Sequence, residues 1–164
     1  MPDPLTGASV QRVRDALARL GSPAEIVALP ATARTATDAA AAVGCALGAI
    51  VKTLVFDLDG ELALALVAGN RRCDTTALAR SLGAVGAVAR ADADQVRAET
   101  GFAIGGVAPV GHRRPLPTTI DASLMRFADV WAAAGHPYCV FRTTPAELVR
   151  LTGGIVVDDL GTAP

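Results

Sequence analysis

The chain has 164 residues, a formal net charge of −1, 51% hydrophobic residues and 19% charged residues. A chain of this size and composition can bury the core of one domain without disulfides or a structural metal, which excludes the disordered and fibrous classes. No apolar run reaches the ~18 residues needed to span a bilayer, and the first residues lack the pattern of a signal peptide. We therefore expect a soluble, cytoplasmic protein with no membrane partner.

The net charge and the cysteine content also limit the kinds of partner and ligand that the protein can bind. A net charge of −1 argues against a wide basic face that coats nucleic acid, so we expect no DNA partner, whereas contact with the end of an RNA stays open. The three cysteines are far apart, and together with the two histidines they form no metal-binding spacing. We expect neither a metal site nor a cofactor.

Helix and strand signals alternate along the chain. In chain order they predict a helix at 9–20, a strand at 25–29, a helix at 37–43, strands at 50–58 and 61–68, a helix at 74–82, a strand at 84–89, a helix at 92–99, strands at 118–120, 127–131 and 138–141, a helix at 144–151 and a strand at 155–157, each helical range including its capping residue. Thr37 is the expected cap of the second helix.

A hairpin signal decides the kind of sheet. Asp59-Gly60 lies between two apolar runs, and both residues tolerate the positive φ that a two-residue turn requires. Hairpins among helix and strand alternations indicate a mixed sheet rather than a purely parallel one. No linker or repeat interrupts the pattern, so we expect a single α/β domain over residues 1–164.

One basic residue stands apart from the others. Fourteen of the fifteen basic residues are arginine, and Lys52 is the only lysine. Its ammonium is compact and has three rotatable donors, which a planar guanidinium cannot imitate. It lies in the apolar run 49–56, so it must be paired, reach a cleft or extend to the surface. Composition and placement alone leave a functional role and chance equally open.

A glycine-rich segment at 101–111 breaks the periodicity of the chain. Paired glycines such as Gly105-Gly106 let backbone N–H groups point into a cavity without side chains in the way. Such a loop can hold a carbonyl, a carboxylate or an attacking water, and a tight structural turn is the alternative. The spacing fits neither a dinucleotide fingerprint nor a phosphate-binding P-loop.

Two further motifs point to other chemistry. The run from Asp57 to Gly60 resembles the first motif of haloacid-dehalogenase phosphatases, and Asp158-Asp159 resembles their acidic magnesium motif. That chemistry needs a cation downstream, usually a lysine, whereas the only lysine lies upstream, so the hairpin is the favoured interpretation. The pairs Arg71-Arg72 and Arg113-Arg114 are candidate contacts to RNA phosphates, with solvated surface as the alternative.

Several segments together resemble one family. Gly48 to Phe56, Gly101 to Gly111, Leu116 to Asp121 and Thr144 to Gly154 are similar, in order and separation, to the YbaK/EbsC family. Its members are free-standing relatives of the editing domain of bacterial prolyl-tRNA synthetases, and the likeness covers about residues 24–160. The resemblance implies an α/β domain with a mixed, barrel-like sheet surrounded by helices. It also implies hydrolysis of the ester between a wrong amino acid and the 3′ end of a tRNA.

The resemblance assigns roles to single residues. Lys52 matches the family's catalytic-site lysine and would hold the phosphate or ribose of the aminoacylated adenosine. The N–H groups of Gly105 and Gly106, in the Gly-x-x-x-Pro loop that ends at Pro109, would hold the carbonyl oxygen or the attacking water. Catalysis would then rest on positioning and oxyanion-type stabilisation, without a metal or a side-chain nucleophile.

Departures from the family pattern concern specificity. Members that clear cysteine carry a tyrosine near the N-terminus, whereas the only tyrosine here is Tyr138. The Gly-His-Pro run at His136 is similar to a pocket loop of members that act on alanine, and Thr35 and Thr53 are candidate pocket neighbours. We expect tRNA(Pro) carrying alanine as substrate, with cysteine and serine open, because synthetases reject small side chains poorly. The alternative is a non-catalytic module that binds aminoacyl-tRNA or a synthetase, and prolyl-tRNA synthetase is a candidate partner.

Overall fold

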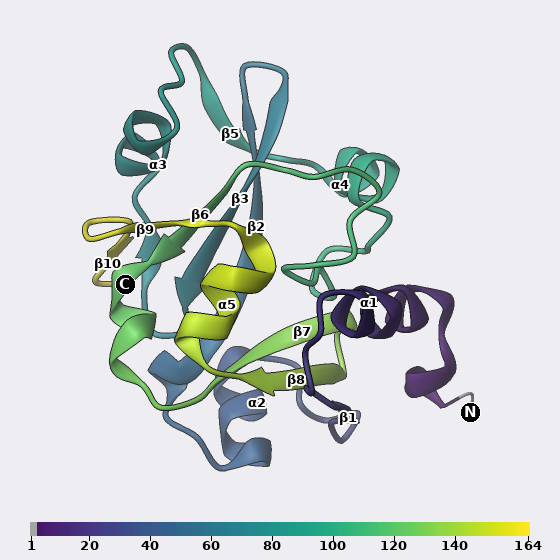
Figure 1. Ribbon diagram of the computed structural model, residues 1–164. Helices are drawn as coiled ribbons and strands as arrows, with labels where there is room; N and C mark the ends of the chain where they lie inside the picture. The colour runs from purple at the N-terminus through teal and green to yellow at the C-terminus, as the bar shows by residue number, and fades with distance from the viewer. Residues whose placement is uncertain (1–2) are drawn as a thin grey trace.

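The two longest strands form a hairpin at the centre of the structure. A computed structural model describes residues 3–164, and in it β2 (Ile50–Leu58) pairs antiparallel with β3 (Glu61–Ala68) (Figure 1). Asp59 and Gly60 have φ values of 56° and 98°, the left-handed conformation that a tight hairpin turn needs. Both strands have the predicted bounds, so the hairpin is confirmed.

Six further strands extend this hairpin into a mixed sheet. They are β1 (Ile26–Ala28), β5 (Val88–Arg90), β6 (Thr118–Asp121), β7 (Val130–His136), β8 (Cys139–Thr143) and β9 (Ile155–Val157). The strand order is β1-β8-β7-β2-β3-β6-β9, with β5 also paired to β2. The pairs β2–β7, β3–β6 and β6–β9 are parallel and the others antiparallel, which confirms the mixed sheet.

Five α-helices surround the sheet. They are α1 (Ala8–Arg19), α2 (Ala36–Val43), α3 (Thr75–Ser81), α4 (Ala93–Thr100) and α5 (Pro145–Thr152), and three 3₁₀ turns are η1 (Pro4–Thr6), η2 (Leu47–Ala49) and η3 (Ala122–Arg126). The caps at 74, 92 and 144 are confirmed, since each side chain accepts a bond from the N–H three residues on. No helix within residues 3–164 is long and apolar enough to cross a membrane.

The cap of α2 is a correction. The hydroxyl oxygen of Thr35, not that of Thr37, accepts the hydrogen bond from the backbone N–H of Asp38, at 3.1 Å. Both threonines precede the alanine run, and Thr35 is the one with the extended backbone of an N-cap, at φ −126° and ψ 166°. The helix therefore begins one residue before Thr37, and Thr35 is held at its start.

The hairpin separates two apolar clusters. Because side chains alternate along a strand, Val51 and Val55 of β2 face the cluster that α1, α4 and α5 complete, and Phe56 faces the one that α3 completes. In Figure 1, α1 and α4 lie on one side of the hairpin and α3 on the other. Cover on both faces explains why β3 is buried from Leu62 to Ala68. A third, small cluster joins α2 to β8 through Ala33 and Val140.

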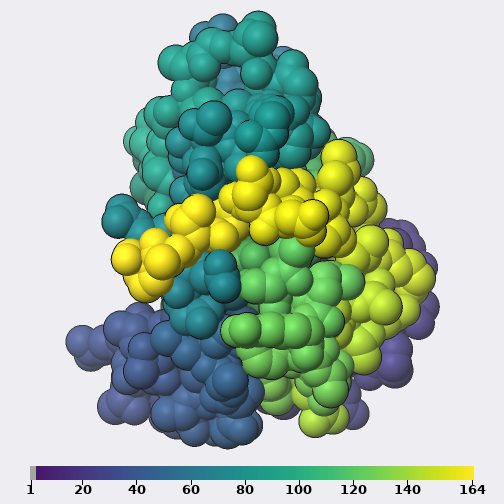
Figure 2. Space-filling model, turned by 90° about the vertical axis from the view of Figure 1, so that its left-hand side faces the viewer, coloured from purple at the N-terminus to yellow at the C-terminus, as the bar shows by residue number. Residues whose placement is uncertain are grey.

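The shortest elements differ from the sequence-based expectation. The strand expected at 84–89 is shorter and shifted, since β5 spans residues 88–90. The strand expected at 127–131 starts later, since η3 extends to Arg126 and β7 begins at Val130. The pair β4 (Arg72–Cys73) and β10 (Gly161–Thr162) was not predicted, since two residues carry no periodicity. Figure 2 shows the C-terminal segment, in yellow, running across one face of the molecule between the teal and green regions.

Candidate active site

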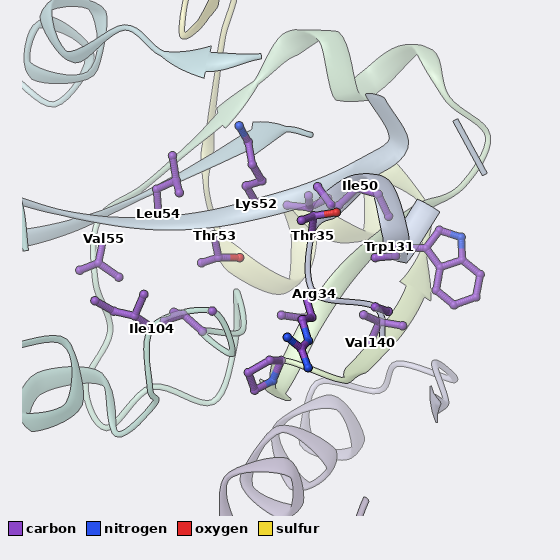
Figure 3. A pocket seen from close by; sticks show the side chains of 18 of the residues that line it. Arg34, Thr35, Ile50, Lys52, Thr53, Leu54, Val55, Ile104, Trp131 and Val140 are labelled. Atoms are coloured by element: carbon purple, nitrogen blue, oxygen red, sulfur yellow. The ribbon is translucent and has the colours of Figure 1, made fainter. Parts of the chain in front are cut away.

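A cavity opens where the sheet is incomplete. β7 pairs with Ile50 and Val51 at the start of β2, and β5 pairs with residues 56–58 at its end. β3 pairs with the opposite edge of β2, so residues 52–55 lack a strand partner only on the edge that β7 and β5 share. A cavity of about 340 Å³ lies along this open edge (Figure 3).

The open edge presents backbone groups of Thr53. The Ala91 N–H donates to the Val55 oxygen, and the Asp59 N–H donates to the Ala87 oxygen, both at 3.0 Å. The backbone N–H and C=O groups of successive residues point to opposite edges of a strand, so those of Thr53 point to the same edge as those of Val55 and Asp59. The pairings of β5 and β7 both stop short of Thr53. A ligand in the cavity therefore meets a free backbone donor and acceptor.

The walls of the cavity are largely apolar. The hydrophobic side chains that line it come from β2, β7, β8, the segment before α2 and the glycine-rich loop; they include Leu29, Ile50, Val51, Leu54, Val55, Ile104, Val107, Trp131 and Val140. Thr35 and Thr53 add hydroxyl groups, and Thr53 Oγ1 is buried with no hydrogen-bond partner among the described residues. An unsatisfied buried hydroxyl inside a cavity favours a polar ligand there.

Three cations also line the cavity. They are Arg34, Lys52 and Arg90, and within residues 3–164 no Asp, Glu, His or Cys lines it. Arg34 and Arg90 were missed in the sequence analysis, because nothing distinguishes them among fourteen arginines. The lining therefore favours an anionic or neutral ligand, and among the described residues it offers no carboxylate or imidazole as a general base.

Lys52 lies on the opposite face of β2 from Thr53. Figure 3 shows Lys52 and Leu54 projecting from one side of the strand, and Thr53 and Val55 from the other, toward Ile104. The ammonium donates a hydrogen bond to the carbonyl oxygen of Arg71. Burial lowers the pKa of Lys52, and the positive charge of Arg90 lowers that pKa further, against the opposing effect of Asp121.

The glycine-rich loop packs on the turn between β7 and β8. A Cβ on Gly106 would lie 2.9 Å from His136 Cα and 3.0 Å from His136 N, so only glycine permits this approach. The Gly106 N–H donates to the Ala103 oxygen at 3.0 Å, and Gly106 does not line the cavity. This differs from the expectation that its N–H would hold a substrate oxygen, because that donor is engaged within the turn. Gly105 and Val107 line the cavity instead.

Comparison with known proteins identifies the domain. The model of a family described as aminoacyl-tRNA editing domain matches residues 30–151. The chain belongs to this editing-domain family. A solved structure provisionally described as a trans-editing enzyme for prolyl-tRNA synthetase has a TM-score of 0.89 and 46% identity, covering 96% of this chain and 99% of that one.

Two curated relatives extend the comparison of the editing domain. A protein of Enterococcus faecalis (strain ATCC 700802 / V583), provisionally named the Cys-tRNA(Pro)/Cys-tRNA(Cys) deacylase EbsC, is 27% identical over 122 residues, 73% of each chain. The proline–tRNA ligase of Nitratidesulfovibrio vulgaris (strain DP4) is 39% identical over 79 residues, which are 48% of this chain and 14% of the ligase. These likenesses confirm the YbaK/EbsC resemblance.

Only some of the other predicted pocket residues line the cavity of the editing domain. Thr35 and Thr53 line the cavity, whereas Pro109 is buried and does not line it. The ring of His136 is not part of the lining either, because its Nδ1 accepts the Tyr138 N–H at 3.0 Å. The next residue, Pro137, does line the cavity. The turn therefore contributes its proline, and His136 contributes the backbone on which Gly106 packs.

The two arginine pairs do not line the cavity of the editing domain. Arg71 donates to the Gly161 oxygen at 3.2 Å, which fastens the C-terminal segment, and Arg72 is exposed on β4. Arg113 donates to the Ala98 oxygen at 3.3 Å, and Arg114 pairs with Glu99 at 2.8 Å. Arg113 and Arg114 thus hold α4, and their expected role in tRNA contact stays a prediction.

The phosphatase interpretation is wrong for this editing domain. Asp59 and Gly60 form the tip of the β2–β3 hairpin rather than a nucleophile loop. Asp57 accepts the Gly60 N–H at 2.6 Å and the Gln95 amide at 2.8 Å, and these bonds lower its pKa. Asp158 and Asp159 follow β9, which β3 and β6 separate from β2. The two acidic motifs therefore do not meet.

Arg12 of α1 anchors the glycine-rich loop, and its removal tests that anchor. Its guanidinium donates to the oxygens of Gly111 (3.0 Å) and Thr100 (3.2 Å) and stacks 4.4 Å from the centre of the Phe102 ring. We expect Arg12→Ala to lower the free energy of unfolding by about 2 kcal/mol, because it removes two charge-assisted hydrogen bonds. Urea unfolding measures this loss. Arg19→Ala, exposed on the same helix, is the control, and equal losses in both variants would contradict the anchor.

His112 makes the stability of this loop depend on pH. Its Nε2 donates to the Ala108 oxygen at 2.7 Å, and burial lowers its pKa from 6.5 to about 4. As the pH falls, the His112 imidazole is protonated near pH 6.5 in the unfolded chain but only near pH 4 in the folded chain. The contribution of His112 to the free energy of unfolding is therefore fully present above pH 6.5 and is lost as the pH falls to 4, by at most about 3 kcal/mol. Urea unfolding of His112→Gln should lack this component. Parallel pH profiles of the variant and the wild type would contradict the assignment.

Proposed function

We propose that the protein is a trans-acting deacylase that hydrolyses the ester between a small, wrong amino acid and the 3′ end of tRNA(Pro), with alanine as the first candidate. The observation that carries this proposal is the cavity at the open edge of β2, which has apolar walls, free backbone groups and no acidic lining residue within residues 3–164. The editing-domain family and the descriptions of the trans-editing structure and EbsC support it.

The cavity suits a small side chain beside a polar ester. Its volume of about 340 Å³ is at the low end of the ~300–1,000 Å³ usual for ligand pockets. Val55 and Ile104 would surround the methyl group of alanine on the Thr53 side of β2. The hydroxyl of Thr53 and its backbone C=O would accept hydrogen bonds from the α-amino group, which would satisfy the orphaned Thr53 Oγ1.

Backbone donors of the glycine-rich loop would stabilise the charge that develops. Gly105 and Val107 line the cavity, and the N–H of neither donates in a backbone turn of the described residues. Held on the ester carbonyl oxygen, they would supply oxyanion stabilisation of the kind whose loss costs about 10²–10³ in rate. Water adds to the carbonyl carbon, the bond to the ribose oxygen breaks, and the proton of the water passes to that oxygen.

Deacylation of a panel of charged tRNAs tests the proposal. We expect Ala-tRNA(Pro) to be hydrolysed well above its spontaneous rate, and cysteinyl and seryl esters of the same tRNA to rank the selectivity. Pro-tRNA(Pro) is the cognate comparison and should be the slowest. Tight binding of charged tRNA without hydrolysis of any ester would overturn the proposal and favour the non-catalytic binding module.

A further inference from the structure

Lys52 shares its side of β2 with a second cation. Arg90 of β5 is directly opposite Phe56 of β2, and its guanidinium lies 5.5 Å from the centre of the Phe56 ring. Lys52 projects from the same face of β2, because residues two and four apart along a strand share a face. Both Lys52 and Arg90 line the cavity, and Leu54 lies on β2 between Lys52 and Phe56, the partner of Arg90.

Both cations have unused hydrogen-bonding capacity. Within residues 3–164 the Lys52 ammonium bonds one neutral acceptor, the Arg71 carbonyl oxygen, and the Arg90 guanidinium bonds none. Neither forms an ion pair in that part of the chain. The acid nearest in effect is Asp121, which is buried and already accepts the N–H groups of Ala68 (3.1 Å) and Ser123 (2.9 Å). Two unneutralised cations at one opening favour an anion there.

The length of the two side chains limits where that anion can bind. Lys52 and Phe56 are four residues apart, so about 13 Å separates their backbone positions. Lysine and arginine are the longest cationic side chains, and Arg90 is the charged residue with the largest effect on the pKa of Lys52. The Arg90 guanidinium lies over the Phe56 ring, and this cation–π contact favours its position beside β2. The ligand is therefore an anion that both heads can approach across Leu54.

We propose that Arg90 is a second phosphate-binding residue, which together with Lys52 holds the phosphate between the last two nucleotides of the tRNA. The inference rests on the proposed function, since the ester would then lie across β2 on the Thr53 side. The planar guanidinium offers paired donors to phosphate oxygens, whereas the ammonium acts as a point charge. Anchoring the phosphate on one face of the strand would fix how far the aminoacyl group extends into the cavity.

Two stable analogues isolate this contact. One is 3′-alanylamino-3′-deoxyadenosine with a 5′-phosphate, and the other is the same nucleoside without the phosphate. We expect the wild type to bind the phosphorylated analogue at least about tenfold more tightly, as for charge-assisted bonds. Arg90→Gln should lose most of that preference and bind the unphosphorylated analogue unchanged, and Arg90→Lys should recover part of it. Arg80→Gln, which removes an exposed cation paired with Asp159, should keep the full preference.

An unchanged phosphate preference in Arg90→Gln would overturn the inference. So would equal weakening for both analogues, because that indicates a structural role rather than phosphate binding. Failure of the proposed function is distinct from either outcome: the wild type would then leave Ala-tRNA(Pro) intact whatever the analogues show. Thermal unfolding of each variant verifies that the comparison is made on folded protein.

Discussion

Replacing Lys52 by alanine should lower kcat/KM for deacylation of Ala-tRNA(Pro) by about 100-fold or more, because misplacing a bound substrate by about 1 Å costs that much. Lys52 is the only lysine of the chain and lines the cavity, where we propose that it helps to hold the acceptor end of the tRNA. The loss should appear with the spontaneous hydrolysis rate subtracted. Full activity of Lys52→Ala would remove the assigned role.

Two further substitutions separate charge from packing at Lys52. Lys52→Met keeps a straight apolar stem without the ammonium, so it should be as inactive as the alanine variant. Lys52→Arg keeps the charge but brings a planar head, and it should recover activity only in part. All three variants lose the hydrogen bond from the Lys52 ammonium to the Arg71 carbonyl oxygen, so their melting temperatures should be measured together with their rates.

Replacing Gly106 by alanine should damage both activity and stability. The added Cβ would meet backbone atoms of His136 at 2.9–3.1 Å, and backbone cannot rotate away as a flexible side chain can. We expect a loss of about 1–3 kcal/mol in the free energy of unfolding, as for other overpacked sites. Because the loop must then move off the β7–β8 turn, Gly105 and Val107 are displaced from the cavity and the deacylation rate should fall at least tenfold.

Gly7 supplies the matched control for Gly106. Its φ is −63°, and a Cβ there would lie 3.5 Å from the Pro4 oxygen, an ordinary contact. Gly7→Ala should therefore change the rate little and lower the stability by no more than about 1 kcal/mol, because Gly7 is the N-cap of α1 and alanine is a poorer N-cap than glycine. If Gly106→Ala behaved like Gly7→Ala, close approach of the loop to His136 would not be what positions the site.

Local signals in the sequence were sufficient for most of the fold. Asp59-Gly60 predicts the turn because its φ values are a property of those two residues, and the caps at Asp74 and Thr144 act within one helical turn. Thr35 was missed as a cap because Thr37 is an equally suitable residue two positions away. The pair β4–β10 joins residues 88 and 90 positions apart and has no local signal.

Some of the residues that line the cavity stand out in the sequence, but the geometry of the cavity does not follow from it. Lys52 and the glycine-rich loop stand out by residue type, whereas the cavity exists because β5 and β7 both stop short on one edge of β2, a non-local pairing. The face on which Lys52 projects follows from strand register, which sequence alone does not determine. Arg90 is one of fourteen arginines, and only its pairing with Phe56 distinguishes it.

A crystal structure with 3′-alanylamino-3′-deoxyadenosine 5′-phosphate tests the central claim most directly, because its amide replaces the labile ester. We predict electron density for the alanyl group in the cavity on the Thr53 side of β2, with the amide oxygen facing Gly105 and Val107. Density for the analogue elsewhere, with the cavity at the open edge of β2 unoccupied at saturating concentration, would contradict the account.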